Sequence, residues 1–232
     1  MQIKSVKNSN YIISLTSWKK RISTTHLTIL SIYKMCPGAH IVLVLSTDEF
    51  PMREKELPKT LLDTGVEILW VKENYKNFKK VLFTIEKYNN LPVISADDGC
   101  IYLTNFAEPL YEKHLKEPNK IIAYNHWFID GVTFSSGGYG VLFPPNCFGT
   151  TGTEILKKYK DKILENGNDD LFIGCLAKIM NLEYFCFMKL YERKTGIFEN
   201  IEECQTYSLT LNKQYKNEVS DIYKYLIKTY KK

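Results

Sequence analysis

Short apolar runs alternate with amphipathic segments through the first half of the chain. The run at residues 41–46 is continuously apolar, which is typical of a strand buried on both faces of a parallel sheet. Strands are predicted at residues 11–16, 41–46, 66–71 and 93–96. Helices are predicted at residues 24–34, 59–64 and 77–88. This β-α-β-α-β-α-β order predicts an α/β fold in which helices flank a parallel, nucleotide-binding type of sheet.

The second half departs from this regular alternation. Helices are predicted at residues 107–116, 154–165 and 169–180, and strands at residues 120–126 and at the end of the Gly/Ser-rich segment 131–143. Residues 217–232 form an amphipathic helix in which lysines separate the apolar positions. Because no repeat or linker interrupts the sequence, a single domain over residues 1–232 is predicted.

Charge and cysteine content limit the classes of partner. Lys and Arg number 31 against 26 Asp and Glu, a formal net charge of +5 at pH 7. This mild excess suits a phosphorylated ligand or an anionic membrane surface and is too small to indicate nucleic acid. The six cysteines include no CxxC pair, which indicates reduced thiols and neither a disulfide framework nor a zinc site.

The apolar segments also bear on localisation. The first ten residues carry no apolar signal-peptide core, and no run approaches the roughly 18 apolar residues of a membrane span. We therefore expect a cytoplasmic protein. The basic C-terminal helix has two interpretations: a surface helix packed on the domain, or a peripheral contact with anionic lipid at the inner face of the membrane.

Two adjacent carboxylates, Asp97 and Asp98, directly follow the fourth predicted strand. An Asp-Asp-Gly sequence is a common turn, and that interpretation needs no ligand. In a parallel α/β sheet, however, ligands bind beyond the carboxyl ends of the strands, where this order of elements places both residues. Their position therefore favours a ligand site.

Several ordered motifs resemble a known enzyme family. They are Ile13-Ser14-Leu15-Thr16-Ser17, Arg21, Asn74-x-Lys76, Lys79-Lys80, Ser95-Ala96-Asp97-Asp98, the segment 140–145 and Asn168-Asp169-Asp170. Over about residues 10–185 the chain resembles small, family-2-like bacterial GT-A glycosyltransferases of surface polysaccharide assembly. The resemblance implies a nucleotide-donor half at about residues 10–105, a mixed acceptor and catalytic half at 106–190, and a helical tail at 191–232. It also implies sugar transfer, by inversion, from a nucleotide-sugar donor, with a UDP-sugar favoured, to a glycan or lipid-linked acceptor.

The resemblance further implies roles for the donor-side residues. Asp98 would bind a divalent metal (Mn²⁺ or Mg²⁺), and Asp97 would reach the ribose or the metal's water shell. The basic residues expected near the diphosphate are Arg21, Lys76, Lys79 and Lys80, and the residues expected at the base or ribose are Thr16 and Ser17. Each basic residue could instead be a solvated charge, and Thr16 and Ser17 a turn or helix cap. Gly99 stands where the family commonly has a third acidic residue in an Asp-x-Asp pattern, which puts the metal in question.

The catalytic base and the acceptor side follow from the second half of the resemblance. Asp169 and Asp170 match the acidic pair that accepts the acceptor's proton, with Asp169 preferred, although an Asn-Asp-Asp start also suits helix capping. On the acceptor side we expect Gly138, His126 and Trp127, while core packing would also account for the last two. The rival functions are a nucleotidyltransferase and a catalytically weak homologue that only binds glycan or nucleotide.

Overall fold

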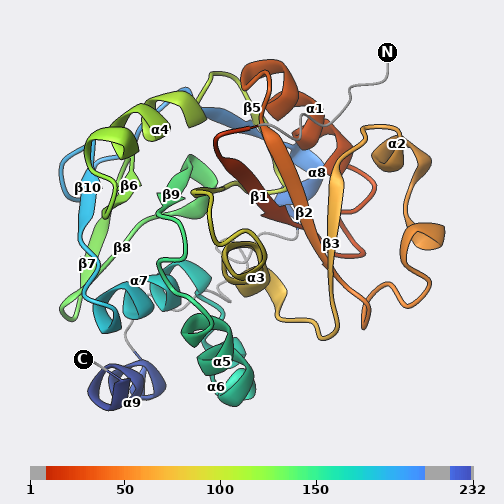
Figure 1. Cartoon of the computed structure of the whole chain (residues 1–232). Helices are drawn as coiled ribbons and strands as arrows, with labels where there is room; N and C mark the ends of the chain where they lie inside the picture. Colours follow the sequence, from red (N-terminus) through yellow and green to blue (C-terminus); the bar gives the residue numbers. More distant parts are fainter. Residues whose placement is uncertain (1–8, 207–219, 231–232) are drawn as a thin grey trace.

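A computed structural model describes residues 9–206 and 220–230. Its centre is a seven-stranded sheet in the order β10-β6-β9-β4-β1-β2-β3 (Figure 1). The strands are β1 (Ile12–Thr16), β2 (His40–Ser46), β3 (Glu67–Val71), β4 (Val93–Ser95), β6 (Ile121–Ala123), β9 (Val141–Phe143) and β10 (Tyr184–Cys186). β1 pairs in parallel with β2 and β4, and β2 with β3, whereas β9 is antiparallel to β4 and β6. The parallel first half and the mixed second half are both confirmed.

Helices cover both faces of this sheet. They are α1 (Thr25–Met35), α2 (Lys59–Leu62), α3 (Lys79–Lys87), α4 (Ala107–Lys116), α5 (Thr151–Lys158), α6 (Lys160–Asn166), α7 (Asp169–Ile179), α8 (Glu202–Gln205) and α9 (Asp221–Tyr230). Because successive strand residues point to opposite faces, Ile12 lies in the core that includes α3 and α7, whereas Ile13 lies in the core that includes α1 and α4. The result is a three-layered α/β/α arrangement with a core on each side of the sheet (Figure 1).

The structure corrects two of the predicted elements in the second half. The helix predicted over residues 154–165 is two helices, α5 and α6, because the backbone of Tyr159 leaves the helical region between them (φ −117°, ψ 25°). The strand predicted over residues 120–126 is only the three-residue β6.

Five short strands have no counterpart in the sequence-based prediction of the described residues: β5 (Cys100–Tyr102), β7 (Trp127–Ile129), β8 (Val132–Phe134), β10 and β11 (Phe198–Asn200). β7 forms a hairpin with β8 across Asp130 and Gly131, whose φ angles are both positive (48° and 78°). An Asp-Gly pair between apolar residues is a strong hairpin signal, so the sequence contained the information for this turn.

The C-terminal helix α9 is packed on the domain. Tyr223 and Leu226 are fully buried, and the Tyr223 ring lies 5.8 Å from the ring of Phe172 on α7. The packed-helix interpretation is therefore confirmed, while residues 217–219 and 231–232 of the predicted helix lie outside the described residues. None of the helices described here combines the length and apolar character that a membrane span requires.

Candidate functional site

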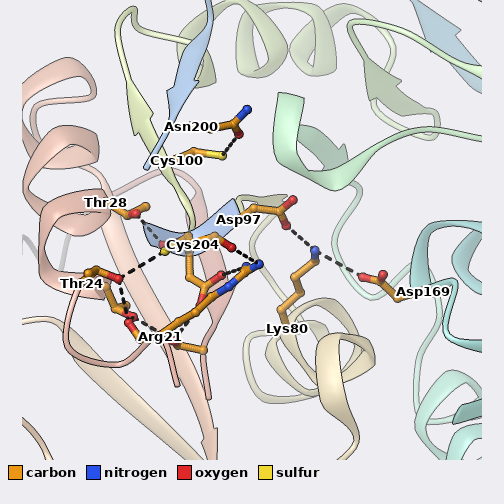
Figure 2. A network of polar contacts seen from close by, with 12 residues as sticks. Arg21, Thr24, Thr28, Lys80, Asp97, Cys100, Asp169, Asn200 and Cys204 are labelled. Atoms are coloured by element: carbon orange, nitrogen blue, oxygen red, sulfur yellow. Dashed lines mark hydrogen bonds and ion pairs between the residues drawn. The ribbon is translucent and has the colours of Figure 1, made fainter. Parts of the chain in front are cut away.

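The carboxyl ends of β1 and β4 position the first part of the site. The two strands are parallel neighbours, with Ser14 opposite Ser95 in the register. Thr16 and Asp97 each lie two residues further along, so the segments after both strands emerge at the same edge of the sheet. α3 begins beside this edge and presents Lys80 to it (Figure 2). This is the edge at which parallel α/β sheets bind ligands.

Asp98 is enclosed by two partners from the segment after β1. Its Oδ2 accepts a hydrogen bond from Ser17 Oγ (2.6 Å), and its Oδ1 accepts one from Arg21 Nη1 (3.0 Å). The residue is only 6% exposed. Burial raises the pKa of the Asp98 carboxyl, and Arg21 and Ser17 oppose that shift. Three residues that the sequence analysis assigned to donor and metal therefore bind one another.

Lys80 forms the centre of a second cluster. Its Nζ donates to Asp97 Oδ1 (2.7 Å) and lies 3.3 Å from Asp169 Oδ2, as Figure 2 shows. The Lys80 side chain is 6% exposed, whereas that of Asp97 is 44% exposed. Burial alone lowers the pKa of Lys80, but the charges of Asp169, Asp97 and Asp170 outweigh it and hold the pKa well above its ordinary value. Lys80 is therefore a fixed positive charge beneath an accessible carboxylate.

Asp170 joins this cluster to a glycine-rich loop. Its Oδ1 accepts a hydrogen bond from the backbone N–H of Gly137 (3.0 Å). Burial and the charge of Asp169 raise the pKa of Asp170 to about 7. The cap of α7 is a different residue, Asn168, whose Oδ1 accepts from Leu171 N (2.8 Å). Asn168, and neither Asp169 nor Asp170, thus provides the side-chain cap of α7.

The loop containing Gly137 and Gly138 lies directly against the cluster. A Cβ on Gly138 would come within 2.7 Å of Asp97 Oδ2, and one on Gly137 would lie 3.1 Å from Lys80 Nζ. Tyr102 Oη donates to the carbonyl of Gly138 (2.9 Å) and accepts from the N–H of Asp97 (3.1 Å), which ties the loop to the carboxylate. Gly138 was expected on the acceptor side, and the structure brings it against the Asp97 carboxylate.

The C-terminal segment covers the other side of the Asp-Asp-Gly sequence. Arg21 Nη2 donates to the carbonyl of Cys204 on α8 (3.0 Å), and the N–H of Ile201 donates to the carbonyl of Gly99 (2.9 Å). β11, which pairs antiparallel with β5, leads into α8. The tail predicted as helical therefore also contains a strand beside the site. No motif marked this segment, because its contacts with the site come mostly from backbone groups.

Two of the predicted donor-side lysines donate to backbone carbonyls. Lys79 is buried next to Lys80, but its Nζ donates to the carbonyl of Lys76 (2.8 Å), and burial lowers its pKa to about 8. Lys76 is exposed and donates to the carbonyl of Leu164 (3.4 Å). Thr16 Oγ1 donates to the carbonyl of Val44 (2.7 Å) on β2. Thr16 and Lys79 thus direct their side-chain donors to backbone carbonyls beside this edge, and Lys76 lies at the surface.

The predicted acceptor residues also separate. Trp127 stacks on Phe134 across the β7-β8 hairpin, with ring centroids 6.0 Å apart. His126 lines a cavity of about 530 Å³ at the carboxyl end of α7, and burial lowers its pKa. The other lining residues are Gly131, Thr133, Gly174, Lys178, Leu182, Glu183, Tyr184 and Cys186. Of the three acceptor-side residues, Gly138 alone contacts Asp97.

The carboxylates do not fit a divalent ion. Mg²⁺ takes six oxygen ligands, of which one or two are usually free carboxylates and the others waters or substrate phosphates. Both oxygens of Asp98 are engaged, and the Lys80 ammonium stands between Asp97 and Asp169. Across residues 9–206 and 220–230, no group of three or more His, Cys, Asp or Glu side chains could hold a metal.

Comparison with solved structures bears on the fold. No protein-family model and no curated protein matches the sequence. The structure is similar to that of a cytidylyltransferase from Leptospira borgpetersenii serovar Hardjo-bovis, with 10% identity, a TM-score of 0.51, and coverage of 95% of this chain and 93% of that one.

Two glycosyltransferases show weaker structural similarity. They are GlyE from Streptococcus pneumoniae TIGR4 (14% identity, TM-score 0.46, 77% of this chain covered) and the mannosyltransferase PcManGT from Pyrobaculum calidifontis, solved with GDP-Man and Mn²⁺ (13%, 0.48, 84%). The matches span only 45% and 60% of the lengths of those two chains. At such identities similarity reports fold alone. The chain therefore has an α/β fold like that of the cytidylyltransferase, with a mostly parallel, seven-stranded sheet.

Proposed function

We propose that this chain is a glycosyltransferase that moves a sugar from a nucleotide-sugar donor, with a UDP-sugar favoured, to a glycan or lipid-linked acceptor. The observation that carries the proposal is the Asp97–Lys80–Asp169 cluster at the carboxyl edge of β4, covered by the bare backbone of Gly137 and Gly138. A buried cation beside an exposed carboxylate at this edge suits a ligand with both phosphates and hydroxyls.

Asp97 is the residue we assign to the donor's ribose. Its side chain is 44% exposed, so its second oxygen can accept hydrogen bonds from ribose hydroxyls while the first stays on Lys80. Asp98 is a positioning residue in this proposal, because it holds Arg21 and Ser17 and has no free oxygen. Asp97 thus keeps the ribose role that the sequence suggested, whereas Asp98 changes from a metal ligand to a positioning residue.

Asp170 is the residue we assign as the catalytic base, in preference to Asp169. A general base works best when its pKa lies near the working pH, and burial together with Asp169 raises the pKa of Asp170 to about 7. Asp169 is buried and paired with Lys80. The acceptor hydroxyl's oxygen would bond to the anomeric carbon, its proton would pass to Asp170, and the bond to the nucleoside diphosphate would break with inversion. Turnover is expected to rise with pH through about 7, as Asp170 loses its proton.

A nucleotidyltransferase is the second candidate, favoured by the likeness to the cytidylyltransferase over nearly the full length of both chains. The two reactions release different products. A glycosyltransferase frees a nucleoside diphosphate from a nucleotide-sugar. A nucleotidyltransferase joins a sugar phosphate to a nucleoside triphosphate, and the triphosphate releases pyrophosphate. Assaying both products with the same protein preparation separates the two.

Thermal shift with UDP, GDP and CDP, followed by hydrolysis of a nucleotide-sugar panel, tests the proposal. We expect at least one nucleotide to stabilise the protein and Asp97→Asn to weaken that effect by about tenfold in affinity. Asp161→Asn on exposed α6 is the control and should bind as the wild type does. If no nucleotide stabilises the chain, the proposed donor site is wrong.

A further inference from the structure

In this site a lysine side chain supplies the positive charge for the donor's diphosphate. Lys80 Nζ stands 2.7 Å from Asp97 Oδ1 and 3.3 Å from Asp169 Oδ2. A metal ion bridging these two carboxylates would have to occupy the space of the ammonium, and two adjacent cations repel each other strongly where water is scarce. Lys80 thus takes the position that a divalent cation would need.

Gly99 removes the alternative position for a metal ligand. A Cβ built on Gly99 lies 3.2 Å from Cys204 Cβ and 3.4 Å from Arg21 Nη1. A carboxylate introduced here would therefore face Arg21 and α8 and would not point toward Lys80. The two carboxylates that precede Gly99 already have cationic partners, Asp97 with Lys80 and Asp98 with Arg21. The glycine therefore fits a site whose carboxylates are paired with side chains.

The Lys80 ammonium can still donate to a ligand. It has three N–H groups, of which two face Asp97 and Asp169. Gly137 has no side chain on that side, where a Cβ would stand 3.1 Å from Nζ and 3.3 Å from both Asp170 Oδ1 and Ser95 Oγ, so any larger residue would crowd the ammonium. Because the neighbouring carboxylates hold the pKa of Lys80 well above its ordinary value, the ammonium stays charged throughout the working pH range.

We propose that Lys80 replaces the divalent cation, so that the site binds a nucleoside diphosphate and stabilises its departure without any metal. The inference rests on the proposed function, since it concerns the same donor. It differs from the Asp-x-Asp pattern of the resemblance, in which a metal ion carries this charge.

The first test measures equilibrium binding of UDP, GDP and CDP to the full chain in EDTA, and then with Mn²⁺ or Mg²⁺. For the nucleotide that binds, we expect affinities with and without metal that agree within about threefold, because the cation is a side chain. A gain of about tenfold or more on adding metal would overturn the inference while leaving the proposed function intact. Absence of binding under every condition would overturn both.

The second test removes the ammonium. Lys80→Met should lower nucleotide affinity and donor turnover by about 100-fold, and Mn²⁺ should not restore either. Lys87 lies at the other end of the same helix and pairs with Glu67 at the start of β3, so Lys87→Met should bind nucleotide normally. Unchanged affinity in Lys80→Met, or recovery with Mn²⁺, would contradict the proposal.

A further variant separates loss of nucleotide binding from loss of folding. Lys80→Met leaves Asp97 and the buried Asp169 without their cation, which destabilises a fold. Lys80→Met combined with Asp169→Asn removes one of those charges and should fold while still losing affinity for the nucleotide. Native-like binding by the folded double variant would contradict the inference, and the metal dependence of the wild-type protein decides the question independently.

Discussion

Ionisation of Asp170 lowers the stability of the folded protein. Its pKa rises from 3.8 to about 7 through burial and the charge of Asp169. The folded state therefore holds a proton between about pH 4 and 7 that the unfolded state has released, and stability falls as pH rises through this window. Above pH 7 Asp170 is ionised in both states, and the full loss of stability is present.

Asp170→Asn should remove that cost. At pH 7.5 we expect the free energy of unfolding to increase by on the order of 1–2 kcal/mol, whereas at pH 4 the variant and the wild type should be equally stable. The Asn oxygen can still accept the Gly137 N–H. Urea unfolding at the two pH values measures the difference. Asp169→Asn, which loses the Lys80 pair, should instead be destabilising. Equal stability of Asp170→Asn and the wild type at pH 7.5 would show that the surroundings of Asp170 do not disfavour its ionised form.

Gly138 is the residue at which backbone and carboxylate come closest. Gly138→Ala would place a methyl group about 2.7 Å from Asp97 Oδ2, so the Asp97 side chain must move off Lys80. We expect a loss of about 1–3 kcal/mol in stability and a parallel loss of nucleotide affinity. The matched test is the same substitution in an Asp97→Ala background, where the cost should largely disappear. Additive effects of the two substitutions would mean that they do not share this contact.

At the scale of elements, α7 connects the acidic pair to the C-terminal helix. Its first residues carry Asp169 and Asp170, and its buried face packs on β8 and on α9. Gly174 permits the close approach to β8, since a Cβ there would lie 2.6 Å from the carbonyl oxygen of Thr133. Tyr223 Oη on α9 also donates to the carbonyl of the cap residue Asn168 (3.3 Å). α9 therefore supports the helix on which the proposed base lies.

Shortening a buried side chain of α9 tests this support. Leu226 is fully buried, so Leu226→Ala should lower the free energy of unfolding by about 2–4 kcal/mol, and the thermal midpoint should fall accordingly. Lys224→Ala, on the exposed face of the same helix, should change stability by less than about 0.5 kcal/mol. A Leu226→Ala protein as stable as Lys224→Ala would mean that α9 does not contribute to the core.

At the scale of the whole molecule, the sheet brings distant segments to one edge. Two clusters of contacts meet at the consecutive residues Asp97 and Asp98, although their members come from distant parts of the sequence: one contains Ser17, Arg21, Asp98 and Cys204, and the other Lys80, Asp97 and Asp169. Figure 2 shows Lys80 between Asp97 and Asp169. The parallel register of β1 and β4 and the short connections from their ends account for much of this convergence. The C-terminal segment completes the set by pairing β11 with β5.

The sequence by itself determined the alternation of strands and helices in the first half and the edge at which Asp97 and Asp98 emerge. Continuous apolar runs and helical spacing are local properties, and the carboxyl end of a parallel strand follows from the order of elements. Three-residue strands such as β5 and β11 are too short for any periodicity to be visible, so only their pairing defines them.

Only the tertiary structure decided which members of each polar pair face the site. Lys79 and Lys80 are neighbours on one helix, and a rotation of about 100° per residue turns one toward Lys76 and the other toward Asp97. Asp97 and Asp98 likewise point to different partners, Lys80 for the first and Ser17 and Arg21 for the second. Since the two members of each pair are chemically identical, their surroundings alone assign Lys80 to the carboxylates and close Asp98 on Arg21.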